Sequence, residues 1–192
     1  MDAFFDAVRG GDVRTVQSLL HEHPSLASAR SPEGISALLL ARYRGHERVV
    51  DALRAAGPDL DVFDASALGD VRTLDILLDL DPLLVEAVAA DGYTALHLAA
   101  HYGQLDAVYR LLQGGAAVDA VAANEGEVRP LHSAAAGGHV EVVAALLEAG
   151  ADPNARQHGG FTALDAARQH GDTDMEQVLL AHGATSPDPG PT

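Results

Sequence analysis

Apolar and polar positions in residues 91–116 alternate in a pattern that predicts two short helices joined by a turn. Apolar side chains recur at helical spacing in two runs, which are Leu96, Ala99 and Ala100, then Leu105, Val108, Leu111 and Leu112. Thr94 stands where its hydroxyl can accept a backbone N–H of the first helical turn, and Gly103 stands where that helix can end. A helix pair this short cannot bury both of its apolar faces, so the pattern predicts further copies beside it.

The same pattern returns along the chain. Residues 131–139 repeat the first helix, residues 142–152 repeat the second, and residues 161–167 begin another copy. The glycine that separates the paired helices falls at Gly11, Gly45, Gly69, Gly103, Gly138 and Gly171. The intervals between these glycines are 34, 24, 34, 35 and 33 residues. The short interval predicts that about ten residues of a connecting hairpin are missing between the second and third copies.

Three local motifs accompany this period: TALHLAA at residues 94–100, GHVEVV at 138–143 and LLEAGADPNA at 146–155. With them the chain resembles the ankyrin-repeat family, in a bacterial-type form. The resemblance implies an all-α solenoid of about six helix-turn-helix repeats with short β-hairpin or turn connections. The expected repeats span residues 2–30, 31–60, 61–90, 91–123, 124–155 and 156–184. Residues 185–192, rich in proline, are expected to be disordered.

The sequence also has a second, longer period. At an offset of 58 residues, FDA at 5–7 returns at 63–65, and GDVRT at 11–15 returns at 69–73. The first two repeats and the next two therefore resemble a duplicated pair, and the short interval marks the seam between them.

Composition narrows the range of chemistry. The 192 residues contain no Cys, and all 12 basic residues are Arg, which is typical of a GC-rich bacterial genome. These counts exclude disulfides, thiolate metal sites and a catalytic lysine in this chain. The start of the sequence does not resemble a signal peptide, and no window is long and apolar enough to span a membrane. We therefore expect a cytoplasmic protein.

The net charge of −16 disfavours direct binding of nucleic acid. Residues 59–91 hold nine acidic residues and one Arg. Helix capping and solvation can account for this charge. An alternative is an inhibitor whose acidic surface mimics a polyanion and blocks a basic protein. Asp59, Asp61 and Asp64 form the candidate acidic patch, which we expect to line a notch at the missing hairpin.

Histidines are the other candidates for chemistry. His97 and His101 have the i, i+4 spacing with which two imidazoles can share a metal ion. In the ankyrin family, however, the histidine of TALH usually forms a hydrogen bond across the hairpin, and the sequence offers no third ligand. His132 has the same structural interpretation, and Ser133 beside it points elsewhere on the helix. We expect no enzymatic activity, no cofactor and no metal; a metal-dependent role of the histidines is the remaining alternative.

The resemblance implies a monomeric protein-binding module with an unidentified protein partner, without nucleic acid or membrane. Its concave face of hairpin tips and first helices is the expected docking surface. The candidate partner-binding residues are Tyr43, Arg44, Tyr93, His101, Tyr102, Phe161 and His170. We expect Tyr43 and Tyr102 at solvent-facing ends of first helices, where tyrosine is favoured in binding hot spots. For Tyr93 and Phe161, packing against neighbouring hairpins is an equal alternative.

Overall fold

The computed structural model describes residues 1–185 and contains two compact units, residues 1–65 and residues 66 onward. We call these the N-terminal unit and the C-terminal unit. The described residues form twelve α-helices and three 3-10 helices, and their only β pairing is two isolated bridges, Arg30 with Ser36 and Val88 with Thr94. The predicted all-α fold is therefore confirmed. The predicted disordered tail lies, except for Thr185, outside the described residues.

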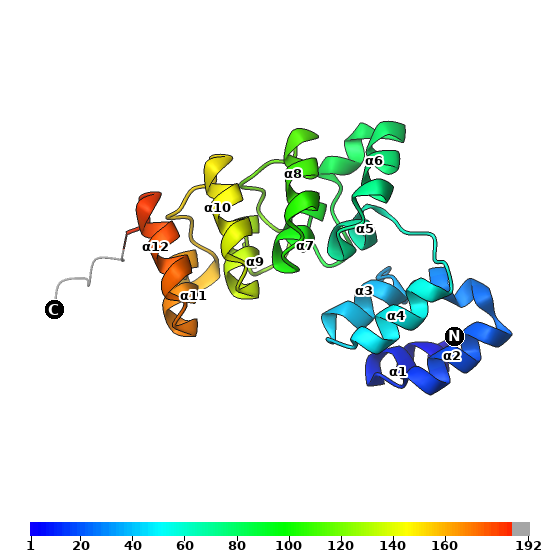
Figure 1. Cartoon of the computed structure of the whole chain (residues 1–192). Coiled ribbons are helices and arrows are strands. Elements are labelled where there is room, and N and C mark those ends of the chain that lie inside the picture. Colours follow the sequence, from blue (N-terminus) through cyan, green and yellow to red (C-terminus); the bar gives the residue numbers. More distant parts are fainter. Residues whose placement is uncertain (186–192) are drawn as a thin grey trace. The chain divides into compact units, whose positions relative to one another are not determined.

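The N-terminal unit consists of two antiparallel helix pairs and the start of a third (Figure 1). Its elements are α1 (Asp2–Gly10), α2 (Val13–Glu22), η1 (Pro24–Ser28), α3 (Ala37–Tyr43), α4 (Glu47–Ala55) and the first residues of α5 (Val62–Leu68). Phe4, Phe5, Leu38 and Leu53 are its largest fully buried side chains. A single short helix pair could not bury these side chains by itself, so packing between the pairs buries them.

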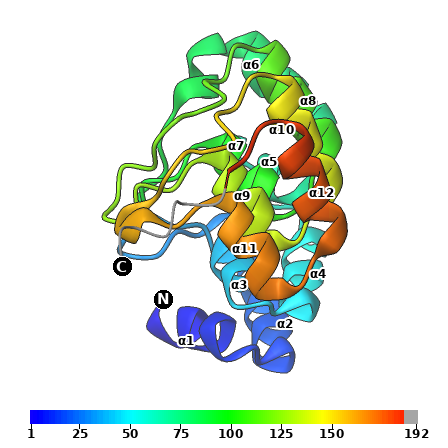
Figure 2. The same ribbon diagram turned by 90° about the vertical axis from the view of Figure 1, so that its left-hand side faces the viewer.

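The C-terminal unit continues the same arrangement. Its elements after α5 are α6 (Val71–Leu80), η2 (Pro82–Glu86), α7 (Ala95–His101), α8 (Leu105–Gln113), α9 (Pro130–Gly137), α10 (Val140–Glu148), η3 (His158–Gly160), α11 (Ala163–His170) and α12 (Thr173–Ala181). The first helices α7, α9 and α11 pack side by side in one layer (Figure 2). The second helices α6, α8, α10 and α12 form the other layer. Leu96, Leu131 and Leu164 repeat at matching positions in the core between them.

Short polar residues set where the helices begin. The Asp12 carboxylate accepts the backbone N–H of Thr15 at the start of α2, and Asp70 and Asp172 do the same for α6 and α12. Each carboxylate satisfies an N–H that has no partner within its helix and lies near the positive end of the helix dipole. In α9, Pro130 occupies the first helical position, where its missing N–H costs no hydrogen bond within the helix.

The connection between α4 and α5 differs from the other connections between helix pairs. Those loops are closed by a backbone hydrogen bond, from Ser31 to Ile35, Ala89 to Tyr93, Ala122 to Val128 and Gln157 to Phe161. Residues 57–61 form neither such a bond nor a β-bridge before α5 begins at Val62. The hairpin predicted to be missing at this point is missing, which confirms the interpretation of the short interval. The exact bounds of the six repeats remain a prediction.

Candidate functional site

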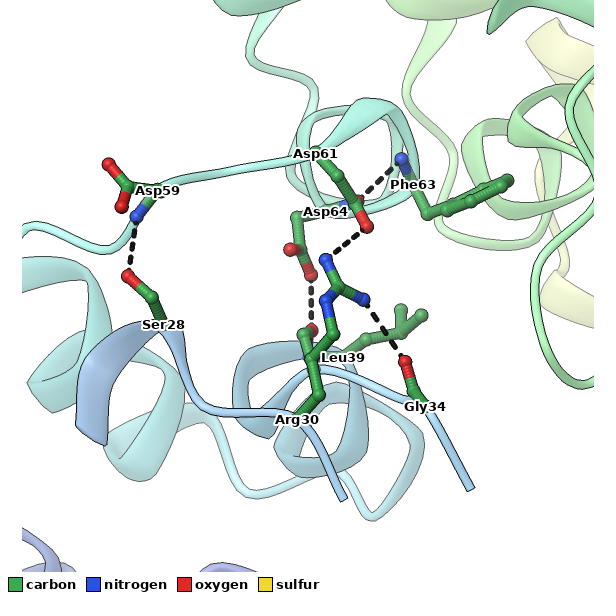
Figure 3. A network of polar contacts seen from close by, with 9 residues as sticks. Ser28, Arg30, Gly34, Leu39, Asp59, Asp61, Phe63 and Asp64 are labelled. Atoms are coloured by element: carbon green, nitrogen blue, oxygen red, sulfur yellow. Dashed lines mark hydrogen bonds and ion pairs between the residues drawn. The ribbon is translucent and has the colours of Figure 1, made fainter. Parts of the chain in front are cut away.

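The acidic residues at the join between α4 and α5 form a polar network with the preceding helix pair (Figure 3). Asp61 caps α5, since its Oδ1 accepts the backbone N–H groups of Phe63 at 2.9 Å and Asp64 at 2.8 Å. Its other oxygen accepts from Arg30 Nη2 at 2.6 Å, and Arg30 Nη1 donates to the carbonyl of Gly34 at 3.1 Å. Asp61 therefore joins the start of α5 to the loop before α3.

Asp64 is a buried carboxyl, only 3% exposed. The hydroxyl of Ser36 donates to its Oδ1 at 2.5 Å, and the same hydroxyl accepts the backbone N–H of Leu39 at 2.9 Å, capping α3. Burial raises the pKa of Asp64 to about 6, and the neighbouring carboxylate of Asp61 acts in the same direction. Asp64 occupies the third position of its helix, where α7 has His97.

The three residues of the candidate acidic patch are therefore not equivalent. Asp59 is exposed, and its backbone N–H donates to the hydroxyl of Ser28 at 2.9 Å. Asp61 is half-buried and engaged by an arginine and two amides, and Asp64 is interior. The sequence did predict capping, which Asp61 performs. It gave no sign that Asp64 would be buried, because that depends on Ser36, 28 residues earlier.

The histidines of the TALH positions are tied into the fold at both ring nitrogens. His97 Nδ1 accepts the N–H of Thr94 at 3.2 Å, and its Nε2 lies 2.9 Å from the carbonyl of Val128. His132 makes the equivalent bonds, to the N–H of Arg129 at 3.1 Å and the carbonyl of Ala155 at 3.0 Å. Burial lowers the pKa of both histidines, which favours the neutral ring. Metal coordination by either ring would break one of these bonds.

A second kind of hydrogen bond between helix pairs was not predicted from the sequence. His46 Nε2 lies 3.0 Å from the carbonyl of Arg9, and His139 Nε2 lies 3.0 Å from that of His101. Gln104 Nε2 reaches the carbonyl of Ala67 at 3.4 Å. Each of the three follows the glycine between paired helices, where the other copies have the capping aspartates. The sequence held one signal for these bonds: the residue after this glycine is Asp in three copies and His or Gln in the other three.

Of the candidate partner-binding residues, five lie in the C-terminal unit. His101 is exposed at the end of α7, and its ring meets that of Tyr102 edge-on, with centroids 4.8 Å apart. Tyr102 is half-buried with its hydroxyl oxygen in the interior, not in solvent as expected. Tyr93 is half-buried, 5.6 Å from the ring of His97, and Phe161 is half-buried. His170 is exposed at the end of α11.

The other two candidates lie in the N-terminal unit. Tyr43 is the last residue of α3 and is 36% exposed, and Arg44 after it is also exposed. Tyr43–Arg44 and His101–Tyr102 thus place an aromatic ring and a cationic or titratable group at the same end of two first helices.

Comparison with known proteins identifies the class of this repeat. The family model described as ankyrin repeats, in three copies, matches residues 62–157 and again residues 126–189. The chain therefore belongs to the ankyrin-repeat family. Ankyrin repeats are protein–protein interaction modules, and the family is generally non-enzymatic.

Similar proteins are longer than this chain. A probable E3 ubiquitin-protein ligase, XBOS31 of Oryza sativa subsp. japonica, is 36% identical over 138 residues, which are 68% of this chain and 29% of that protein. Ankyrin repeat and SAM domain-containing protein 6 of Rattus norvegicus is 36% identical over 62% of this chain and 13% of its own length. The B-cell lymphoma 3 protein homolog of Mus musculus is 38% identical over 50% of this chain and 21% of its own length. The chain spans less than a third of each of these relatives.

Within residues 1–185, no group of three or more His, Cys, Asp or Glu is arranged to hold a metal ion. In the same residues, no helix has the length and hydropathy needed to cross a bilayer.

Proposed function

We propose that this chain is a non-enzymatic module that binds a protein partner through the face formed by its hairpin tips and first helices. The observation that supports it best is that the end of a first helix is exposed in both units, with Tyr43 and Arg44 at the end of α3 and His101 at the end of α7. Exposed tyrosine and arginine are the residue types enriched in binding hot spots. Tyr93, Phe161 and His170 extend the surface in the C-terminal unit.

The contacts of the histidines and of the acidic patch argue against the alternative functions. Both nitrogens of His97 and of His132 are engaged by the backbone, which leaves neither ring available as a base or metal ligand. The polyanion mimic is the weaker candidate, because Asp61 and Asp64 are engaged within the fold and only Asp59 of the patch is exposed. We also propose that the protein is a cytoplasmic monomer that does not bind nucleic acid. The net charge of −16 supports the absence of nucleic-acid binding.

The test begins with a quantitative pull-down from the native lysate, followed by affinity measurement with the purified partner. Replacing Tyr43 and His101 by alanine should weaken the complex at least about tenfold, because both side chains are exposed at the proposed contact. Tyr102 is left unchanged in this test, since its hydroxyl is interior and truncation would disturb the fold.

Tyr109→Ala is the matched control. Tyr109 is 44% exposed on α8 in the layer of second helices, so its loss should leave affinity unchanged. Equal affinities for the double variant and the unaltered chain, with unchanged melting temperatures, would show that the partner docks elsewhere.

A further inference from the structure

Three hairpins of the C-terminal unit are joined to one another by backbone hydrogen bonds. They are the loops closed at residues 89–93, 122–128 and 157–161. The N–H of Ala123 in the second hairpin donates to the carbonyl of Gly92 in the first at 2.8 Å, and the N–H of His158 in the third donates to the carbonyl of Gly126 in the second at 2.9 Å. Both bonds lie within the C-terminal unit, so the three hairpins form one surface whatever surrounds it.

An apolar side chain stands at the same place in each hairpin. Tyr93, Val128 and Phe161 each provide the carbonyl that closes their hairpin, and each side chain is half-buried, with part of its surface in solvent. Val88 and Val121, immediately before the first two hairpins, are 52% and 49% exposed. We call Tyr93, Val128 and Phe161 the hairpin row.

The spacing of the hairpin row selects the conformation of a bound segment. The first helices α7, α9 and α11 that follow the hairpins pack side by side, and packed helices lie about 8–10 Å apart. A polyproline II segment advances about 9.3 Å per turn of three residues, so its side chains at i, i+3 and i+6 face one side at this spacing. In a β-strand, residues i and i+3 point to opposite faces. An α-helix needs about 13 residues to span the row, and isolated helices of that length are marginal in water.

The charges beside the row differ from hairpin to hairpin. Glu125 and Glu127 are exposed in the second hairpin, whereas Arg156 is exposed immediately before the third. Glu127 is the only non-glycine residue within residues 1–185 with a positive φ, +50°, and it precedes Val128 where Gly92 and Gly160 precede the other members of the row. A carboxylate therefore stands at the middle of the row in a position whose backbone favours glycine.

We propose that the hairpin row binds a polyproline II segment of another protein, with an apolar residue at every third position and Lys or Arg beside the central one. The apolar residues cover the row, because segments of this conformation dock on surfaces lined by aromatic side chains. The cations meet Glu125 and Glu127, and Arg156 disfavours further cations at the third hairpin. The inference rests on the proposed function, since the hairpins belong to the same face, and it adds the class of segment that is bound.

A second copy of this chain fits the row poorly. Each copy carries a net charge of −16, and its proline-rich residues 185–192 contain no Lys or Arg. Those residues therefore offer no cation to Glu125 and Glu127, whether they come from a second copy or from the same chain.

A designed peptide is the probe. It is a fluorescein-labelled, proline-rich peptide of about nine residues, with leucine at i, i+3 and i+6 and lysine on both sides of the central leucine. Binding is followed by fluorescence anisotropy at physiological ionic strength. One control peptide has glutamate in place of lysine, and the other has the same composition with leucine at i, i+2 and i+4. The unaltered chain should bind the first peptide at least about fivefold more tightly than either control.

The decisive variant removes the charge of the second hairpin without straining the fold. Glu125→Gln with Glu127→Gly should weaken binding of the lysine peptide at least about threefold. Its melting temperature should stay the same or rise, because glycine adopts a positive φ without steric cost. Asp106→Asn with Glu141→Gln is the matched control, since it removes the same charge from the second helices α8 and α10. It should bind as tightly as the unaltered chain.

Phe161→Ser tests the apolar contact at the end of the row. It should weaken binding at least about tenfold, and its melting temperature is measured first because the ring is half-buried. Tyr109→Ser, which removes an aromatic ring that is 44% exposed on α8, should leave binding unchanged.

Four results would overturn the proposal: no binding of the lysine peptide, equally tight binding of the peptide with leucine at i, i+2 and i+4, undiminished binding by the variant without Glu125 and Glu127, or self-association of the unaltered chain that Phe161→Ser abolishes. The test with Tyr43 and His101 measures the native partner instead. If those two side chains matter for the native partner but the peptide controls bind equally well, the proposed function stands and only this inference is rejected. If the peptide results hold and the native partner is indifferent to Tyr43 and His101, the contact proposed at the helix ends is the one rejected.

Discussion

At the scale of single residues, Gly103 meets two separate constraints. Its φ of +68° lies in the left-handed region, and a Cβ there would come within 2.5 Å of Nδ1 of His139. Gly171 has nearly the same φ, +66°, with nothing within 4 Å of its Cβ position. Both alanine substitutions should cost the backbone term of about 1–2 kcal/mol. Gly103→Ala should cost about 1 kcal/mol more, because it displaces the ring that bonds to the His101 carbonyl.

Urea unfolding of the two variants measures this difference directly. Gly103→Ala combined with His139→Ala provides the control, since without the imidazole only the backbone term remains. The excess cost should then disappear. If it persists in the His139→Ala background, the steric explanation is wrong.

At the scale of elements, Ser36 joins two helices with one hydroxyl. It caps α3 by accepting from Leu39 and donates to the buried carboxyl of Asp64 at the start of α5. Ser36→Ala should therefore cost about 1 kcal/mol for the lost cap and a further 1–3 kcal/mol, roughly, for leaving Asp64 without this donor. Asp12→Ala, which removes an exposed cap from α2, should cost only about 1 kcal/mol. Equal losses in urea unfolding of the two variants would contradict a stabilising role of the Ser36–Asp64 bond.

The elements also separate what the sequence could predict from what it could not. The start of α9 at Pro130, the missing hairpin before α5 and the structural role of His97 each follow from local residue types and spacing. The burial of Asp64 and the bond from His139 to His101 join residues 28 and 38 positions apart, so they depend on packing that no local pattern specifies. The candidate docking residues were predicted only by position within the repeat. Tyr43 is exposed at the end of its first helix, as expected from that position, whereas packing against neighbouring residues buries the hydroxyl of Tyr102.

At the scale of the whole molecule, the two units should respond to acid in opposite directions. In the N-terminal unit, the pKa of Asp64 is about 6 in the folded chain against 3.8 for an unperturbed group. Between these values the folded state holds a proton that the unfolded state lacks. Stability therefore rises by about 1 kcal/mol as the pH falls from about 7 to about 5. Asp12 and Glu33, whose pKa values are lowered by hydrogen bonds, stay ionised over this range.

In the C-terminal unit, the buried rings of His97 and His132 have the reverse effect. Their pKa values are lowered below 6.5 in the folded chain, so the unfolded state binds protons that the folded state does not. Protonation would also remove the lone pair of Nδ1, with which each ring accepts a backbone N–H. Stability of this unit is therefore complete above about pH 6.5 and falls as the pH drops below that value.

Hydrogen exchange resolved by segment, corrected for the intrinsic dependence on pH, separates the two trends. Between about pH 7 and pH 5, protection should rise in α3 and fall in α7 and α9. Asp64→Asn keeps an acceptor for Ser36 without the titration, so it should abolish the rise in α3 and leave the fall unchanged. His97→Gln with His132→Gln should abolish the fall, because neither amide titrates. A uniform change in both units, or a rise in α3 that survives Asp64→Asn, would show that other groups control the response to acid.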